Sequence, residues 1–140
     1  MTVLSTLIRV HRWALEEKQR KLADLEALIE RLRGDLMRLE EEIVAEQATA
    51  PQSFVATTAY PAFLAAALER KRRLTLSIAN IAASLEAARD ELAEAFREVK
   101  SYELAAKNQD QRRKTRRSKR EQVALDEIGL EGHRRKRRDA

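Results

Sequence analysis

The sequence has no cysteine and few of the residues that shape compact folds. Its 140 residues include three Gly, two Pro and six aromatic side chains. Without cysteine the chain has neither disulfides nor thiolate metal sites, and it is compatible with a reducing compartment. A compact core normally uses more Gly, Pro and aromatic residues than this chain has. The composition therefore argues against an ordinary globular domain.

Long uncharged apolar segments are also missing. A transmembrane helix needs about 20 consecutive, mostly apolar residues, and no such run occurs. The apolar stretch near the N-terminus is broken by Arg9, His11 and Arg12, which argues against a signal-peptide core. The chain has two histidines, so a histidine metal cluster is not expected. We predict a soluble protein without a metal or cofactor.

What the chain has in abundance is charge. Charged residues make up 36% and hydrophobic residues 44%, a balance typical of long, exposed helices. The net charge of +5 arises at the C-terminal end, where residues 107–140 carry 13 Lys and Arg against 6 Asp and Glu. The basic character of the chain therefore belongs to its last quarter.

Apolar residues recur every three or four positions from Leu4 to Ile43. Ten of these twelve positions are apolar, and His11 and Lys18 are the exceptions. A stripe with a mean spacing of about 3.5 residues stays on one side of a helix only in a left-handed supercoil with a partner helix. We call it the first seam, and it consists of Leu4, Ile8, His11, Leu15, Lys18, Leu22, Leu25, Ile29, Leu32, Leu36, Leu39 and Ile43.

A second stripe follows a linker that contains Pro51. We expect Thr57 or Thr58 to cap a new helix, with Pro61 in its first turn, where a missing N–H costs nothing. Thirteen of the fourteen positions in this stripe are apolar, and Lys71 is the exception. The second seam consists of Tyr60, Leu64, Ala67, Lys71, Leu74, Ile78, Ile81, Leu85, Ala88, Leu92, Ala95, Val99, Tyr102 and Ala106.

Two such seams in one chain predict an all-α fold in which two long helices form an antiparallel coiled-coil hairpin. We expect helix 1 over residues 3–48, a turn over 49–58 and helix 2 over 59–128, so that the second helix overhangs the first. Together they form one domain over residues 1–128. Two glycines then predict the end of order and a flexible basic tail over residues 129–140.

The predicted pairing gives the polar seam residues a structural role. Counting outward from the turn places Lys18 near Ala88 and Leu4 near Tyr102. Polar residues inside a seam usually set the register or reach water, which is our interpretation of His11, Lys18 and Lys71. Four aromatic residues lie off the seams, where they either anchor a partner or flank the core. They are Trp13, Phe54, Phe63 and Phe96.

The segment over residues 107–120, which we call the basic arm, has eight basic residues and one acidic residue. It is either a solvated extension of helix 2 or a docking arm for an acidic protein surface or nucleic acid. Clustered Lys and Arg suffice to bind phosphates. No zinc spacing, Gly-rich phosphate loop or RNP-like motif accompanies them, so nucleic acid is the less favoured partner. Residues 134–138 are interpreted as a tail tether.

The carboxylates give no sign of an active site. Asp and Glu lie along the wet face of helix 1, where nothing would shift a pKa toward that of a general acid or base. A helix lying on a membrane is disfavoured because the other helix already occupies the apolar seam. We predict a protein that is not an enzyme, has no small-molecule substrate and binds other proteins.

The order of these features resembles the FliJ family of flagellar type III export proteins over nearly the whole chain. The resemblance rests on the opening LSTLIRVHRWALEEKQRKLADLE, the acidic LMRLEEEIVAEQ, the restart AYPAFLAAALE and the tail KREQVALDEIGLEGHRRKRR. Its most distinctive parts are Tyr60 and Phe63 after the linker, and Leu125, Asp126 and Glu127 after the basic arm.

The resemblance implies a cytoplasmic protein that is peripheral to the inner membrane through its partners. These partners are the export ATPase ring, the membrane-embedded export gate and the substrate chaperones that it escorts. The ring-facing end then includes Leu4, Leu7 and the basic arm, and the gate face near the turn includes Leu39, Phe63 and Ala67. The candidate contacts in the arm are Arg112, Arg113, Arg116, Arg117 and Arg120.

Three alternatives to this function remain open at the level of the sequence. They are a nucleic-acid-binding coiled coil, a structural spacer and the corresponding stalk protein of a virulence-type injectisome. We expect a monomer, although the same seams would pair between two chains if the turn opened.

Overall fold

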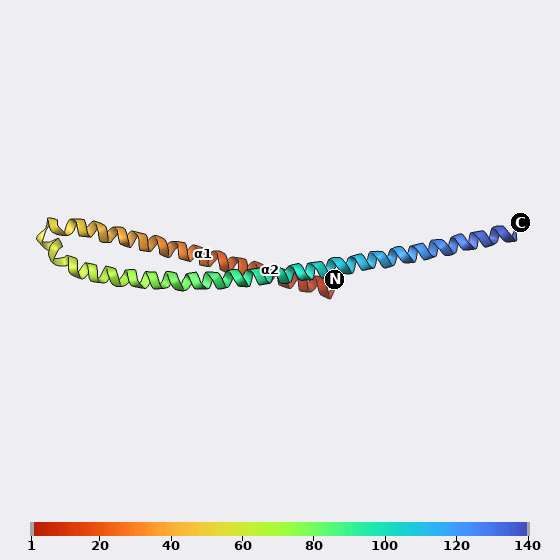
Figure 1. Cartoon of the computed structure of the whole chain (residues 1–140), viewed down its shortest axis with the longest axis horizontal. Coiled ribbons are helices and arrows are strands. Elements are labelled where there is room, and N and C mark those ends of the chain that lie inside the picture. Colours follow the sequence, from red (N-terminus) through yellow and green to blue (C-terminus); the bar gives the residue numbers. More distant parts are fainter. Residues whose placement is uncertain (1, 140) are drawn as a thin grey trace. The chain divides into compact units, whose positions relative to one another are not determined.

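The computed structural model describes residues 2–139, and these form two long helices with a short one between them (Figure 1). Helix α1 spans Val3–Thr49, the 3₁₀ helix η1 spans Ala50–Gln52, and α2 spans Phe54–Arg138. The described residues contain no strand. The expected all-α fold with two long helices is confirmed.

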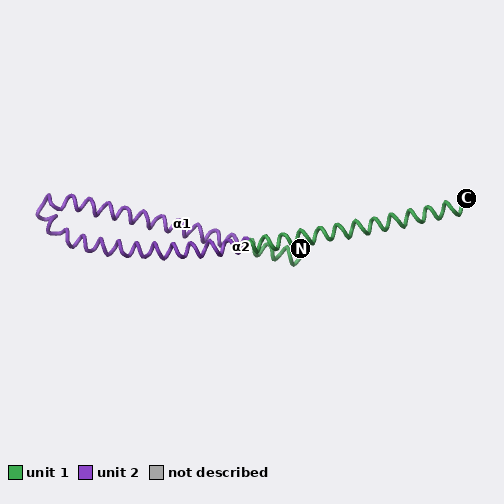
Figure 2. The backbone as a smooth tube through the Cα atoms, viewed as in Figure 1, with its two compact units in different colours: residues 1–12, 97–140 green, residues 13–96 purple. Residues whose placement is uncertain are grey.

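The chain divides into two compact units, coloured separately in Figure 2. Unit 2 covers residues 13–96 and holds most of α1, the turn and the first half of α2. Unit 1 combines the chain up to residue 12 with the chain from residue 97 onward. This division differs from the expected boundary at residue 128, and the separate tail over residues 129–140 stays a prediction.

Both helices begin at a side-chain cap. The Ser5 amide donates to Thr2 Oγ1 (3.1 Å) at the start of α1, and the Ala56 amide donates to Ser53 Oγ (2.9 Å) at the start of α2. Each bond satisfies a backbone donor that has no partner inside the helix. The expectation of a cap at Thr57 or Thr58 is wrong, because both residues lie inside α2.

The turn is shorter than we expected. Because Ser53 caps α2, the helix begins five residues before the expected residue 59, and only residues 50–53 separate the two α-helices. The hydroxyls of Thr57 and Thr58 donate to carbonyl oxygens four residues back, each at 2.8 Å, as they do within helices. Pro61 therefore lies beyond the first turn, where its missing N–H removes one helical hydrogen bond.

Helix α2 also continues past its expected end at residue 128. Gly129 and Gly132 lie inside it, and each costs about 1 kcal/mol relative to Ala. The neighbouring Leu, Glu and Arg residues are good helix formers, and four basic residues occupy the last turn. Positive charge is favourable there because it faces the negative end of the helix dipole.

Unit 2 is an antiparallel helical hairpin closed by the two seams. Within it, Ile29 and Leu39 of α1 and Ala67, Leu85 and Ala88 of α2 expose between 2% and 8% of their surface. Every other seam position of this unit is half-buried or buried. Burial of one large aliphatic side chain contributes roughly 1.5–3 kcal/mol. The small alanines leave room for the leucines of the facing helix.

Unit 1 continues the same seams, with a register different from the one we expected. Its buried positions are Ile8 of α1 and Val99 of α2. We expected Leu4 beside Tyr102, but His11 stacks on Tyr102 instead, with ring centroids 4.6 Å apart. Leu4 lies with Ala105 farther along α2. The two helices are therefore offset from the pairing obtained by counting outward from the turn.

Replacing a seam leucine by aspartate is expected to unfold the hairpin. Leu85 is 8% exposed, so Leu85→Asp removes apolar burial and places a charge in the seam, at a cost above about 3 kcal/mol. Leu76→Asp is the matched control, because Leu76 is 55% exposed on the same helix. Thermal unfolding followed by circular dichroism measures both. Equal melting temperatures for the two variants would contradict the seam.

Candidate protein-interaction surfaces

The N-terminal end of α1 forms one candidate surface together with α2 in unit 1. Leu4 is half-buried, and Leu7 exposes 37% of its surface. Both line a shallow hollow of about 670 Å³, and Arg112 lies at the same hollow. The remaining lining residues are Thr2, Val3, Ala105, Asn108 and Gln109. The structure thus brings together two predicted leucines and one predicted arginine of the ring-facing end.

Polar contacts fasten this end of α1 to α2. Arg12 donates from Nε and from one terminal nitrogen to Glu103 Oε1, at 3.2 and 2.9 Å. His11 Nδ1 lies 3.5 Å from Glu98 Oε2. The hydrogen bond from Arg12 is the main cause that lowers the pKa of Glu103, and Lys100, 3.4 Å away, adds to it. The surface is therefore held by an ion-pair network beside the seam.

The two lysines of the seams make comparable contacts in unit 2. Lys18 Nζ lies 3.4 Å from Glu91 Oε2, and Lys71 Nζ lies 3.5 Å from Glu40 Oε1. Each pair joins one helix to the other. Their long side chains place the charged nitrogen at the edge of the seam, which agrees with a role in setting the register rather than in binding a partner.

The basic arm forms the second candidate surface. All five predicted arginines are exposed: Arg112, Arg113, Arg116, Arg117 and Arg120. Arg117 Nε lies 3.5 Å from Glu121 Oε1, an exposed pair one turn apart, which contributes little. Asn108, Gln111 and Thr115 line a second shallow hollow with Arg112 and Arg116. The arm offers cationic side chains around a helix.

The predicted gate residues differ in accessibility. Leu39 and Ala67 expose only 4% and 5% of their surface, because they are seam residues. Phe63 is half-buried, and its ring lies 6.5 Å from that of Tyr60. Of the three residues, only Phe63 presents a large side chain at the surface. Leu39 and Ala67 support the helices from within the seam.

Several exposed apolar residues were missed at the level of the sequence. Val3 and Val10 expose 80% and 54% of their surface and share a helix face with Leu7, because the three are spaced four and three apart. In unit 2, Leu68 and Leu76 are half exposed beside a hollow that Arg72 also lines. The sequence signal that could have identified these residues is their three- and four-residue spacing at positions outside the seams.

Three of the off-seam aromatics, all in unit 2, are exposed. Trp13 exposes 62% and Phe54 86% of their surface. Phe96, in the same unit, exposes 51%. Large exposed aromatic side chains of this kind are frequent anchors of protein–protein contacts.

One strongly shifted carboxylate lies on α2 in unit 2. Glu69 accepts hydrogen bonds from Arg72 at 3.0 and 2.8 Å and from Arg73 at 3.2 Å. The Arg72 bonds are the main cause that lowers the pKa of Glu69 to about 2. This carboxylate is therefore ionised at neutral pH and serves to order two arginines on the helix surface.

Fold and surfaces together define an all-α, two-helix protein whose chemically distinctive side chains lie on exposed helix faces. Among residues 2–139, no helix is long and apolar enough to cross a membrane. Within the same range, no group of three His, Asp or Glu side chains is arranged to hold a metal ion.

Comparison with known families places the chain among flagellar proteins. The family described as "Flagellar FliJ protein" matches residues 1–138. The chain therefore belongs to the FliJ family, which confirms the resemblance and implies a role in flagellar protein export. No curated protein matches the sequence. No solved structure matches it either.

The Arg12–Glu103 contact leads to a pH-dependent prediction. Because the folded pKa of Glu103 is lowered, its contribution to stability is present above the ordinary carboxyl pKa and is lost as the pH falls through the lowered value. In Arg12→Gln the pKa of Glu103 should rise toward its ordinary value. In the control Lys100→Gln it should rise less. Carboxyl-carbon NMR titration measures both, and a larger shift in the control would refute the assignment.

Proposed function

We propose that this protein is a non-enzymatic stalk and escort component of the flagellar export apparatus. In this proposal the N-terminal end of α1 and the basic arm bind the export ATPase ring. The protein also contacts the export gate and escorts chaperones that carry filament-type substrates. The observation that carries the proposal is the family match over residues 1–138.

The chemistry of unit 1 supports binding to the ring. Leu4 and Leu7 supply an apolar contact area, and the basic arm supplies exposed arginines that suit an acidic rim. Complementary charge speeds association and fixes orientation, while apolar contacts supply much of the affinity. A surface that combines charged and apolar contacts is suited to reversible binding inside another protein.

The proposed gate face lies in unit 2, near the turn. Phe63 provides an accessible aromatic ring there, and Leu39 and Ala67 fix the helices beneath it. Phe54 and Val44 add apolar area close to the turn, with 86% and 66% of their surfaces exposed. An aromatic anchor on a rigid helix is a common centre of a protein-binding site.

The electrostatics support a non-enzymatic role. The two carboxylates with shifted pKa values, Glu69 and Glu103, are both lowered by arginine partners. A general acid at neutral pH requires the opposite shift, toward a higher pKa. We accordingly propose that the protein acts by binding alone, in the cytoplasm, as a monomer held at the inner membrane through its partners.

Charge reversal in the arm tests the proposal. Arg112, Arg113, Arg116 and Arg117 are replaced by Glu, and binding to the purified export ATPase of the same organism is measured by surface plasmon resonance. We expect affinity to fall at least about tenfold, because charges that favour association become repulsive. Circular dichroism should remain that of a helical protein, since the arm buries no seam residue.

The matched control reverses four charges elsewhere on the same helix, at Arg134, Arg135, Arg137 and Arg138. Its net charge equals that of the arm variant. If both variants lose the same affinity, binding depends on net charge alone and the arm has no specific role. If the unmodified chain does not bind the ATPase at physiological salt, the proposed function fails.

A further inference from the structure

Large apolar side chains are exposed on α2 beyond the basic arm. Val123, Leu125, Ile128 and Leu130 expose 57%, 65%, 68% and 59% of their surface. Every residue from 107 to 139 is exposed. Within the seams, the facing helix occupies the apolar side chains and leaves none for a membrane. These four residues lie beyond Ala106, the last seam position, so no facing helix covers them.

Two of them share a helix face with basic residues. Val123 and Leu130 are seven residues apart, so they lie on the same side of α2. Basic residues continue this line in both directions at spacings of three and four. We call it the basic–apolar face, and it consists of Arg116, Lys119, Val123, Leu130, Arg134 and Arg137.

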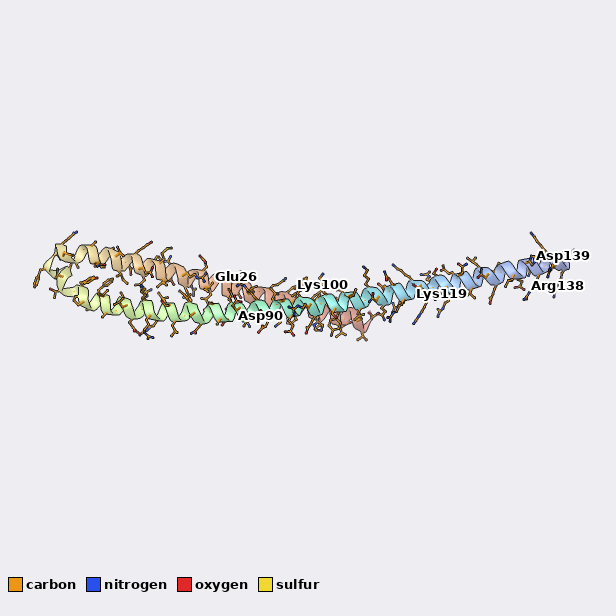
Figure 3. The ribbon with its side chains drawn as sticks, in the orientation of Figure 1. Glu26, Asp90, Lys100, Lys119, Arg138 and Asp139 are labelled. Atoms are coloured by element: carbon orange, nitrogen blue, oxygen red, sulfur yellow. The ribbon has the colours of Figure 1, made fainter. Side chains whose placement is uncertain are left out.

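The opposite side of the helix is different in character. Leu125 and Ile128 lie there, next to Glu121. Asp126 and Glu127 are the acidic residues on the basic–apolar face itself, at spacings of three and four between Val123 and Leu130. Figure 3 labels Lys119 and Arg138 on this part of α2 and shows side chains extending from both sides of the ribbon. Four cations and two apolar residues therefore surround two acidic residues, and the face keeps a net positive charge.

We propose that this face binds directly to the anionic surface of a lipid bilayer, with α2 lying in the plane of the headgroups. Clusters of Lys and Arg are attracted to anionic lipids, and their aliphatic stems lie along apolar surroundings while the charge reaches the phosphates. Val123 and Leu130 enter the boundary between headgroups and acyl chains. The binding needs no other protein.

Two observations favour a lipid surface over nucleic acid. Residues 107–138 contain no Phe, Tyr or Trp that could stack on a base. Contacts with phosphates alone also leave the exposed Val123 and Leu130 without a role.

The spread of charge favours a lipid surface over a single acidic helix of a partner protein. Arg113, Arg120 and Arg138 lie on the flank of the basic–apolar face, each three or four residues from a residue of its line. Headgroups of a bilayer reach the sides of an embedded helix as well as its underside. A partner helix contacts one stripe only.

Sedimentation of the full-length chain with vesicles tests the proposal. We expect binding to vesicles of phosphatidylcholine mixed with phosphatidylglycerol, none to phosphatidylcholine alone, and weakening as salt is added. Replacing Arg134, Arg135 and Arg137 by Gln should weaken binding roughly a hundredfold, because each cation near an anionic surface contributes a factor of about five.

A matched pair of double variants tests the face itself. Val123→Ser with Leu130→Ser removes its two apolar residues and should weaken vesicle binding about tenfold or more. Leu125→Ser with Ile128→Ser removes two apolar residues from the opposite side and should leave binding within about threefold of the unmodified chain. Circular dichroism verifies that both variants keep the same helix content.

Four results would overturn the proposal. The first is equal binding to vesicles with and without phosphatidylglycerol, and the second is no binding at low salt. The third is an equal loss of binding in the two double variants. The fourth is displacement from the vesicles by duplex DNA or polyglutamate, combined with unchanged vesicle binding of the Val123→Ser, Leu130→Ser variant. The last result would assign the stretch to nucleic acid or to an acidic protein. Because no ATPase is present, these results are independent of the test of ring binding.

Discussion

Burial of the two seams against each other is the interaction on which the rest of the structure depends. The chain has no cysteine and therefore no disulfide, so the free energy that holds α1 against α2 comes mainly from one apolar stripe on each helix, with ion pairs beside it. The nearly buried residues are medium or small, such as Ile29, Leu39 and Ala88. A narrow seam of this kind keeps most of each helix surface exposed, and that exposed surface carries the function.

The end of the second seam also explains where α2 changes from a half-buried helix to a fully exposed one. Up to Ala106, α2 carries an apolar residue at nearly every seam position, and each of those positions is at least half-buried. From residue 107 onward every described residue is exposed. No side chain has to pack against α1 there, so the helix can carry cations on every side. Helix propensity and the favourable charge at its C-terminal end support it instead.

The periodicity of the sequence predicted the seams well, because the spacing of apolar residues is a local property that survives without knowledge of the turn. Every seam position is half-buried or buried, including His11, Lys18 and Lys71. The turn was harder to predict. Ser53, Thr57 and Thr58 are all plausible caps, and only the competing hydrogen bonds show that Ser53 is used.

The pairing was also harder to predict, because a count outward from the turn assumes that the two helices run side by side without an axial offset. His11, and not Leu4, contacts Tyr102, an offset that the length of the turn does not explain. The candidate site was predictable where it depends on charge, as in the basic arm. It was less predictable where it depends on accessibility, since Leu39 and Ala67 are seam residues and Val3 and Val10 are not.

The two proposed uses of α2 share cations, and this has a thermodynamic consequence. Arg116 belongs both to the proposed ring contact and to the basic–apolar face, so one copy cannot offer it to both partners at once. Two ligands that compete for one face weaken each other's binding by the same factor. Val123 and Leu130 belong only to the lipid-binding face, so they would set the balance between bilayer and ring without altering the charge that attracts either one.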